Sequence, residues 1–156
     1  SRTAYWAVRS LVVAGGAVAG YIAGTKLLGI IKQFIYNKGL LYKIPSVLRW
    51  FLGLGVETQL ANSLYNNYQQ HIFGNKAHGW DDVIKTGISK RQIFDTIFGK
   101  TQQLITLANN GSNEIRTYLW GRQVTIRFFF QDGVIRSIDS FVGWSSRIIG
   151  KYIKGY

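Results

Sequence analysis

The chain has 156 residues, 47% hydrophobic and 15% aromatic, so it can bury a real core and is not a disordered tail. Its 19 basic and seven acidic side chains give a formal charge of +12, which favours an anionic partner such as nucleic acid, a membrane surface or an acidic protein. The absence of cysteine excludes a disulfide framework and a cysteine-based zinc site, and with only two histidines we expect neither a metal nor another cofactor.

The first part of the chain is predicted to be helical. Residues 10–25 carry no charge and are rich in glycine and alanine. The segment is shorter than the ~20 residues that a membrane-crossing helix needs, but its small-residue face suits close helix packing, in a membrane or in a soluble bundle. Gly39 and Pro45 mark a break, and apolar residues at helical spacing predict one helix or two over 46–73.

A change of pattern near residue 76 predicts a domain boundary. We expect a helical entry or translocation region over 1–75 and a second domain over 76–156. The second domain begins with two short predicted helices. The first ends at Gly87, and the second is capped by Ser89 and closed by Gly99.

The rest of the chain is predicted to be mostly strand. Residues 102–107 are strand-like, and residues 114–141 alternate apolar and polar side chains over three strands. The segment 145–156 is predicted to be a short basic amphipathic helix. The predicted fold is therefore α+β, with a helical region followed by two short helices packed on an antiparallel sheet of about four strands.

The polar face of the predicted sheet gathers Arg116, Tyr118, Thr125 and Arg127 instead of the lysine and glutamate of a plain solvated face. A hairpin turn at Gly121–Arg122 would place Arg116 directly opposite Arg127. Like charges in that position cost stability unless an anion lies between them, so this face suits a ligand with phosphates.

The next turn extends the polar face. A three-residue turn over 131–133 would bring Ser137 and Asp139 onto it. Arg136 then falls on the apolar side, which indicates either an edge strand or an error in the pairing.

Metal-independent cleavage of RNA needs a base for the 2′-hydroxyl proton, an acid for the leaving oxygen and cations around the phosphorus. We predict that Arg116 and Arg127 hold the scissile phosphate. Three side chains are candidates for positioning and proton transfer: His78, Tyr118 and Thr125. Further contacts to RNA are predicted from five basic residues: Lys85, Lys90, Arg91, Arg122 and Arg136.

Other interpretations of these residues stay open. The face can bind phosphate or RNA without chemistry, or it can be a solvated face on which Asp139 pairs with Arg127. His78 precedes a predicted helix and can equally be a capping loop residue. His71 lies at the end of a predicted helix beside apolar residues, and we assign it a structural role.

Five short motifs follow one another between residues 76 and 141. They are His78, Gly87-Ile88-Ser89, Ile93 with Ile97, Arg116 with Tyr118, and the hairpin sequence "VTIRFFFQDGV" over 124–134. In this order they resemble the motifs of the RelE/barnase/colicin/EndoU-like group of ribonuclease toxins. The resemblance implies an endoribonuclease that works without a metal, and we expect it to cut tRNA by attack of the 2′-hydroxyl.

The same resemblance implies a biological setting. Domains of this group commonly lie at the carboxy end of large secreted effectors such as contact-dependent inhibition proteins, and the absence of methionine, position 1 included, indicates that the chain was cut from a longer one. Residues 1–75 would then make transient membrane contact during entry, and the toxin would act in the cytoplasm of the target cell. A cognate immunity protein is implied, and a basic toxin favours an acidic one.

Two rival functions come from other classes. One is a small membrane-associated subunit with a basic docking surface for anionic lipid or a partner protein. The other is an RNA-binding module without catalytic activity.

Overall fold

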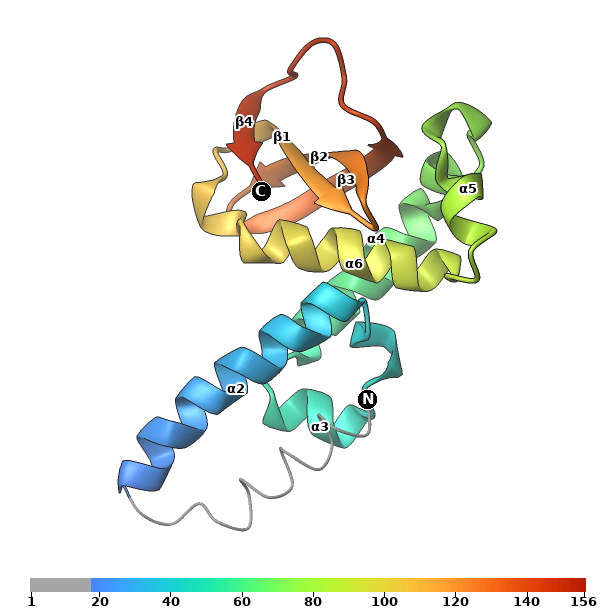
Figure 1. The fold of residues 1–156 in the computed structure, drawn as a ribbon. Coiled ribbons are helices and arrows are strands. Elements are labelled where there is room, and N and C mark those ends of the chain that lie inside the picture. Colours follow the sequence, from blue (N-terminus) through green and yellow to red (C-terminus); the bar gives the residue numbers. More distant parts are fainter. Residues whose placement is uncertain (1–17) are drawn as a thin grey trace.

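The computed structural model of the chain describes residues 18–156, with side chains from residue 24 onward (Figure 1). Residues 10–17 of the predicted segment 10–25 lie outside the described part, and residues 18–25 are helical as predicted. The α-helices of the described part are α2 (Val18–Lys38), α3 (Ser46–Phe51), α4 (Gly55–Phe73), α5 (Trp80–Ile84) and α6 (Lys90–Gln103). Three short 3-10 helices join them: η1 (Leu41–Lys43), η2 (Lys76–His78) and η3 (Ile105–Leu107). The strands are β1 (Gly111–Leu119), β2 (Arg122–Gln131), β3 (Val134–Val142) and β4 (Lys151–Lys154).

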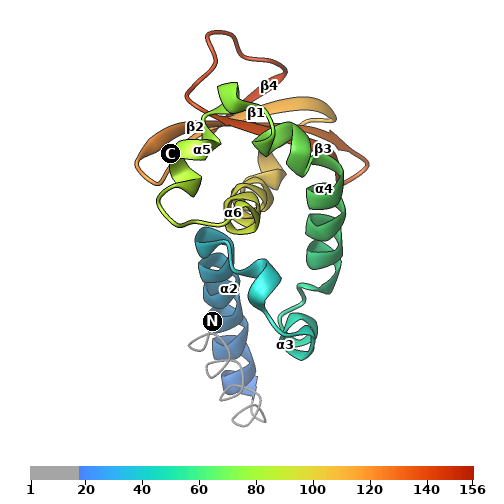
Figure 2. The same cartoon turned by 90° about the vertical axis from the view of Figure 1, so that its right-hand side faces the viewer.

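The four strands form one sheet in the order β3-β2-β1-β4, and the helices lie on one side of it. In the view of Figure 2, α6 is seen end-on beneath the sheet with α4 beside it, and α2 and α3 form a further layer below. The α+β class is therefore confirmed. The sheet is mixed, not purely antiparallel as predicted, because β4 runs parallel to β1.

A single cluster of buried apolar side chains extends from Ile31 in α2 to Ile153 in β4. It crosses the predicted boundary near residue 76, because α4 packs against both α6 and β3. The described part of the predicted entry region therefore shares its core with the sheet. Within the described residues, no helix combines the length and apolar character that crossing a membrane requires.

Two helix signals in the sequence have different outcomes. Ser89 caps α6 as predicted, since its hydroxyl oxygen accepts a hydrogen bond from the backbone N–H of Gln92 at 3.1 Å. Gly99 does not end this helix, which continues to Gln103 and takes up the start of the predicted strand 102–107. A Cβ atom at Gly99 would lie 2.7 Å from the carbonyl oxygen of Tyr36, so this glycine permits the close approach of α2 to α6.

The predicted helix over 145–156 is wrong. Residues 151–154 form β4, with Ile153 opposite Ile115 and buried in the core. Residues 143–150, here called the strap, connect β3 at one edge of the sheet to β4 at the other. The strap passes over the outer face of the sheet, which is the face directed away from the helices (Figure 1).

The first hairpin turns one residue earlier than predicted. Its turn is Trp120–Gly121, with positive φ angles of 51° and 71°, and Leu119 pairs with Arg122. The register therefore shifts by two residues, which keeps every side chain on its predicted face but changes its partner. The predicted Arg116–Arg127 pair is wrong. Trp120 is held in its strained conformation by packing edge-on against Trp80, with ring centroids 6.2 Å apart.

The second hairpin also turns over two residues instead of three, Asp132–Gly133. A register shift between Phe129 and Phe130 leaves Arg136 without a cross-strand partner on β3, which is an edge strand. Both explanations offered for Arg136, an edge strand and an error in the pairing, therefore apply.

Candidate active site

The outer face of the sheet is organised around Glu114, a fully buried carboxylate. Glu114 lies opposite Arg127, whose Nε donates to Oε1 at 2.8 Å, and Arg116 Nε donates to Oε2 at 3.4 Å. The hydroxyl of Ser145 in the strap donates to the same carboxylate, 3.2 Å and 3.1 Å from its two oxygens. The anion expected between the two arginines is therefore a side chain of the protein itself, and it fixes both guanidinium groups.

Arg116 is enclosed by these contacts. Its Nη2 donates to the carbonyl oxygen of Ser145 at 2.7 Å, and its guanidinium lies 6.0 Å from the ring of Trp144 and 5.9 Å from that of Tyr152. The group predicted to hold phosphate thus secures the strap to β1.

Arg127 faces an open pocket of about 590 Å³ between α4, β2, β3 and the strap. The pocket is lined by Asn67, Tyr68, His71, Ser112, Asn113, Arg127, Phe128, Phe129, Ser137, Ile138, Asp139 and Ile149. Because Glu114 engages Arg127 through Nε, the guanidinium keeps its two Nη groups for a ligand in the pocket. An anion entering the pocket therefore meets a cation that is already held in place.

His71, to which the sequence interpretation gave a structural role, lies on the wall of the pocket. Ile72 and Phe73 next to it are buried and anchor the end of α4, whereas the side chain of His71 is 63% exposed. Its Nε2 lies 3.2 Å from Oδ2 of Asp139. A carboxylate oxygen accepts hydrogen bonds, so this contact suits the histidine tautomer with its hydrogen on Nε2, which leaves Nδ1 as a proton acceptor.

Asp139 is itself held in position. Its Oδ1 accepts a hydrogen bond from the backbone N–H of Ser140 at 2.9 Å, and it pairs across the strands with Arg127. The spacing of Asn67, Tyr68 and His71 on α4 brings all three side chains to the same pocket. This spacing was the signal in the sequence that linked His71 to other polar residues.

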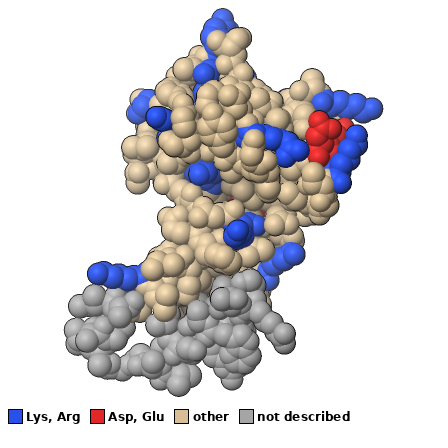
Figure 3. All heavy atoms as spheres, in the orientation of Figure 1, with Lys and Arg blue, Asp and Glu red and all other residues tan. Residues whose placement is uncertain are grey.

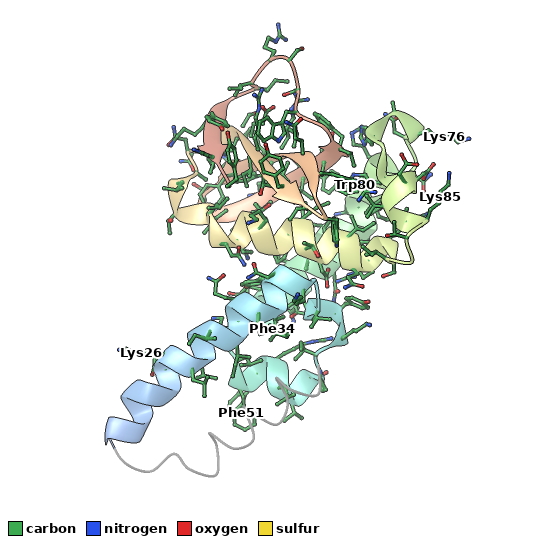
Figure 4. The ribbon with its side chains drawn as sticks, in the orientation of Figure 1. Lys26, Phe34, Phe51, Lys76, Trp80 and Lys85 are labelled. Atoms are coloured by element: carbon green, nitrogen blue, oxygen red, sulfur yellow. The ribbon has the colours of Figure 1, made fainter. Side chains whose placement is uncertain are left out.

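His78 lies on the other side of Asp139 and is only 13% exposed. Its Nδ1 donates to the carbonyl oxygen of Ile72 at 3.0 Å and lies 3.9 Å from Oδ1 of Asp139. The indole N–H of buried Trp80 donates to the carbonyl oxygen of Ser140 at 3.0 Å, which fixes this segment against β3 (Figure 4). His78 thus lies behind Asp139, on the side away from the pocket, and is not one of the lining residues.

The two histidines and Asp139 also have the composition of a metal site. Among the described residues, their candidate ligand atoms lie within 4.8 Å of one another. Ligand atoms around a tetrahedral zinc ion, at bond lengths near 2.1 Å, lie only about 3.4 Å apart. The Nδ1–H of His78 is also bonded to the carbonyl group of Ile72, so this nitrogen would have to give up that bond before it could bind a metal.

The remaining catalytic candidates lie outside the pocket. Thr125 is fully buried, its hydroxyl donates to the carbonyl oxygen of Gly143 at 2.7 Å, and it does not line the pocket. Tyr118 is 48% exposed, but it lies next to Trp144 and Tyr156 beyond Arg116. The structure therefore brings only Arg127 of the predicted catalytic set into the pocket.

The five basic residues predicted to contact RNA also differ in how far they are exposed. Arg91 is bonded within the helical layer, where Nε donates to Asp95 at 2.9 Å and Nη2 donates to Asn62 at 2.5 Å. Lys85 is exposed near two aspartates of α5. On the face shown in Figure 3, the acidic side chains lie together at the α5 end of the molecule, with basic side chains around them. Lys90 and Arg136 are exposed, and Arg122 is half-buried.

Comparisons with protein-family models, with curated proteins and with solved structures give no match.

Proposed function

We propose that the protein is a metal-independent endoribonuclease whose active site is the pocket between α4 and the outer face of the sheet. The observation that carries the proposal is the His71–Asp139 pair on the wall of the pocket that also contains Arg127. A proton acceptor held by a carboxylate, next to an immobilised guanidinium, is the combination that cleavage of RNA by its own 2′-hydroxyl requires.

In this mechanism Arg127 binds the scissile phosphate through its Nη groups. Nδ1 of His71 takes the proton of the 2′-hydroxyl, and O2′ attacks phosphorus as the bond from phosphorus to O5′ breaks. Tyr68 lies in the same pocket one helical turn before His71. Its hydroxyl donates to the carbonyl oxygen of Arg136 at 3.3 Å in the free protein, and in the mechanism it gives up this exposed contact and protonates O5′. The products are a 2′,3′-cyclic phosphate and a 5′-hydroxyl. Phe129, 40% exposed in the pocket, offers its ring to a neighbouring base.

The proposal extends to the toxin setting that the motif resemblance implies. We propose that tRNA is the substrate and that the chain is delivered as part of a larger secreted effector. The formal charge of +12 supports an RNA substrate and an acidic immunity protein, because both are attracted to a basic surface.

The test is incubation of total cellular RNA with the purified protein in EDTA, followed by gel analysis and end-group assignment. The wild type is expected to give discrete fragments with cyclic phosphate ends. His71→Ala is expected to reduce the rate by about 100-fold to 10,000-fold, the contribution of a general base. The matched control is Asn66→Ala, an exposed position on α4 outside the pocket lining, which is expected to cleave like the wild type.

Other results would overturn the proposal. Equal cleavage by His71→Ala and the wild type would remove His71 from the mechanism. Intact RNA with a folded wild type would remove the nuclease, and salt-dependent RNA binding would then identify a non-catalytic RNA-binding module. Binding to anionic vesicles without affinity for RNA would instead favour the membrane-associated subunit.

A further inference from the structure

Three aromatic rings pack together on the outer face at the β1–β4 side, away from the pocket. Tyr118, Trp144 and Tyr156, here called the aromatic cluster, have ring centroids 5.2 to 5.4 Å apart. Trp144 and Tyr156 are stacked with an interplanar angle of 27°. Tyr118 meets Tyr156 edge-on at 85°.

The aromatic cluster is exposed, although its backbone is firmly held. Tyr118 is 48% and Tyr156 is 56% exposed. Trp144 Nε1 donates to the carbonyl oxygen of Thr117 at 3.2 Å. The backbone N–H of Gly155 donates to the carbonyl oxygen of Arg116 at 2.9 Å. The aromatic cluster is therefore a fixed group of rings in which Tyr118 and Tyr156 keep about half of their surface accessible to a ligand.

Positive charge accompanies the rings. Lys154 Nζ lies 4.7 Å from the centroid of the Tyr156 ring. Aromatic rings interleaved with cations are the combination that binds single-stranded nucleic acid, in which the rings stack on bases and the cations follow the phosphates.

The aromatic cluster and the pocket lie on the same face of the sheet. Arg127 on β2 pairs with Glu114 on β1, and Tyr118 follows four residues further along β1. With strands about 4.8 Å apart and a rise of about 3.4 Å per residue, Arg127 and Tyr118 are separated by roughly 14 Å. A nucleic acid strand whose phosphate lies at Arg127 reaches the aromatic cluster within a few nucleotides.

We infer that the aromatic cluster binds unpaired bases that flank the scissile phosphate, so the substrate is a single-stranded segment of RNA. The inference builds on the proposed function, which places the scissile phosphate at Arg127. In a duplex each base is already stacked and paired, and its ring face is closed to protein side chains. Stacking on tyrosine and tryptophan tolerates every base, so the aromatic cluster selects for strandedness and not for sequence.

The test is RNA binding by the full chain carrying His71→Ala, which removes the proposed base and leaves the aromatic cluster intact. Fluorescence anisotropy with an unstructured RNA oligonucleotide and with a blunt duplex of equal length gives the two affinities. The single strand is expected to bind at least about tenfold more tightly than the duplex. Tyr118→Leu and Tyr156→Ala are each expected to weaken single-strand binding by about fivefold to 100-fold, the contribution of one stacked base.

Two control variants separate stacking from folding. Tyr118→Phe keeps the ring and is expected to bind like the parent. Trp50→Ala removes a 77% exposed aromatic side chain on α3, far along the chain from the sheet, and is also expected to bind like the parent.

Equal affinity for single strand and duplex, with no loss in Tyr118→Leu or Tyr156→Ala, would overturn the inference while leaving cleavage by the wild type intact. Failure of the proposed function has a different signature, since single-strand binding would be retained while the wild type leaves RNA uncut. If an acidic protein binds at the aromatic cluster and RNA does not, the inference is also wrong.

Discussion

The protein buries two carboxylates completely, and arginine meets each of them in a different setting. Asp95 in α6 accepts from Arg91 Nε at 2.9 Å and from the backbone N–H of Tyr42 at 2.8 Å. The guanidinium of Arg91 also packs on the ring of Tyr65, 4.8 Å from its centroid, so an aromatic side chain covers this ion pair. Glu114 in β1 holds two arginines, and one of them faces an open pocket.

The difference between these two networks shows that an arginine–carboxylate pair does not indicate function by itself. Around Asp95 every neighbour belongs to the helical layer, so the pair joins α6 to the segment after α2. Glu114 is bonded to Nε of Arg127, so the Nη groups of this arginine stay available in the pocket that His71 and Asp139 also line. The surroundings of the guanidinium, and not the ion pair, distinguish the candidate site from the scaffold.

Replacing Arg127 and Arg91 one at a time tests this distinction most directly and is expected to give the largest effect. Arg127→Ala is expected to lower the cleavage rate by about 100-fold to 1,000-fold, because it removes the donors that stabilise charge on the phosphate. Arg91→Ala is expected to cleave like the wild type at a temperature where both are folded. Single-turnover cleavage with denaturation curves for each variant provides the measurement, and equal losses of rate in both would abolish the distinction.

Neutralising the Glu114 carboxylate tests how much its ion pairs contribute to the free energy of unfolding. Glu114→Gln leaves the guanidinium groups of Arg116 and Arg127 without the negative charge that both of them contact. We expect the free energy of unfolding to fall by about 3 kcal/mol, the usual cost of removing one partner from a buried ion pair. Urea denaturation measures it, and Asp132→Asn at an exposed turn position is the control, with an expected change below about 0.5 kcal/mol.

Asp95→Asn is expected to have the smallest effect, with a dependence on pH. Burial raises the pKa of Asp95 above its ordinary value of 3.8, and this outweighs the lowering effects of Arg91 and of the N–H of Tyr42. The folded chain therefore binds this proton more tightly than the unfolded chain, so the contribution of Asp95 to stability increases as the pH falls through its folded-state pKa and is complete below 3.8.

At about pH 7 we expect Asp95→Asn to cost about 1 kcal/mol, the value of a typical hydrogen bond. The advantage of the wild type over this variant should grow on acidification, since asparagine binds no proton. Denaturation of both proteins across the acidic range measures the difference. A difference that shrinks as the pH falls would show that Arg91 outweighs burial and that Asp95 is held ionised.

The sequence predicted those features of the fold that depend on neighbours along the chain. The cap at Ser89, the break after α4 and the alternation over 114–141 are local, and the structure contains all three. Gly99 misled because its role is to make room for Tyr36, which lies in another helix. The pairing of residues 151–154 with β1 is likewise set by a strand about 40 residues earlier in the chain.

The candidate site was predictable only in part for the same reason. Arg127 was assigned to the polar face because alternation alone determines its side of the sheet. The partner of Arg127 depended on the turn, and a tryptophan at positive φ is a conformation that sequence patterns do not favour. His71 joins the site only because α4 runs along the edge strand β3, a contact between distant segments that no local pattern reports.

The order of the strands also has a consequence for synthesis. β4 is the last of the four strands to leave the ribosome, and it supplies the partner for one edge of β1. A nascent chain that has been made only as far as the strap therefore exposes an open edge on β1, which is prone to pair with other chains. The outer face can become complete only after the helical layers and the first three strands have been synthesised, because β4 supplies its last edge.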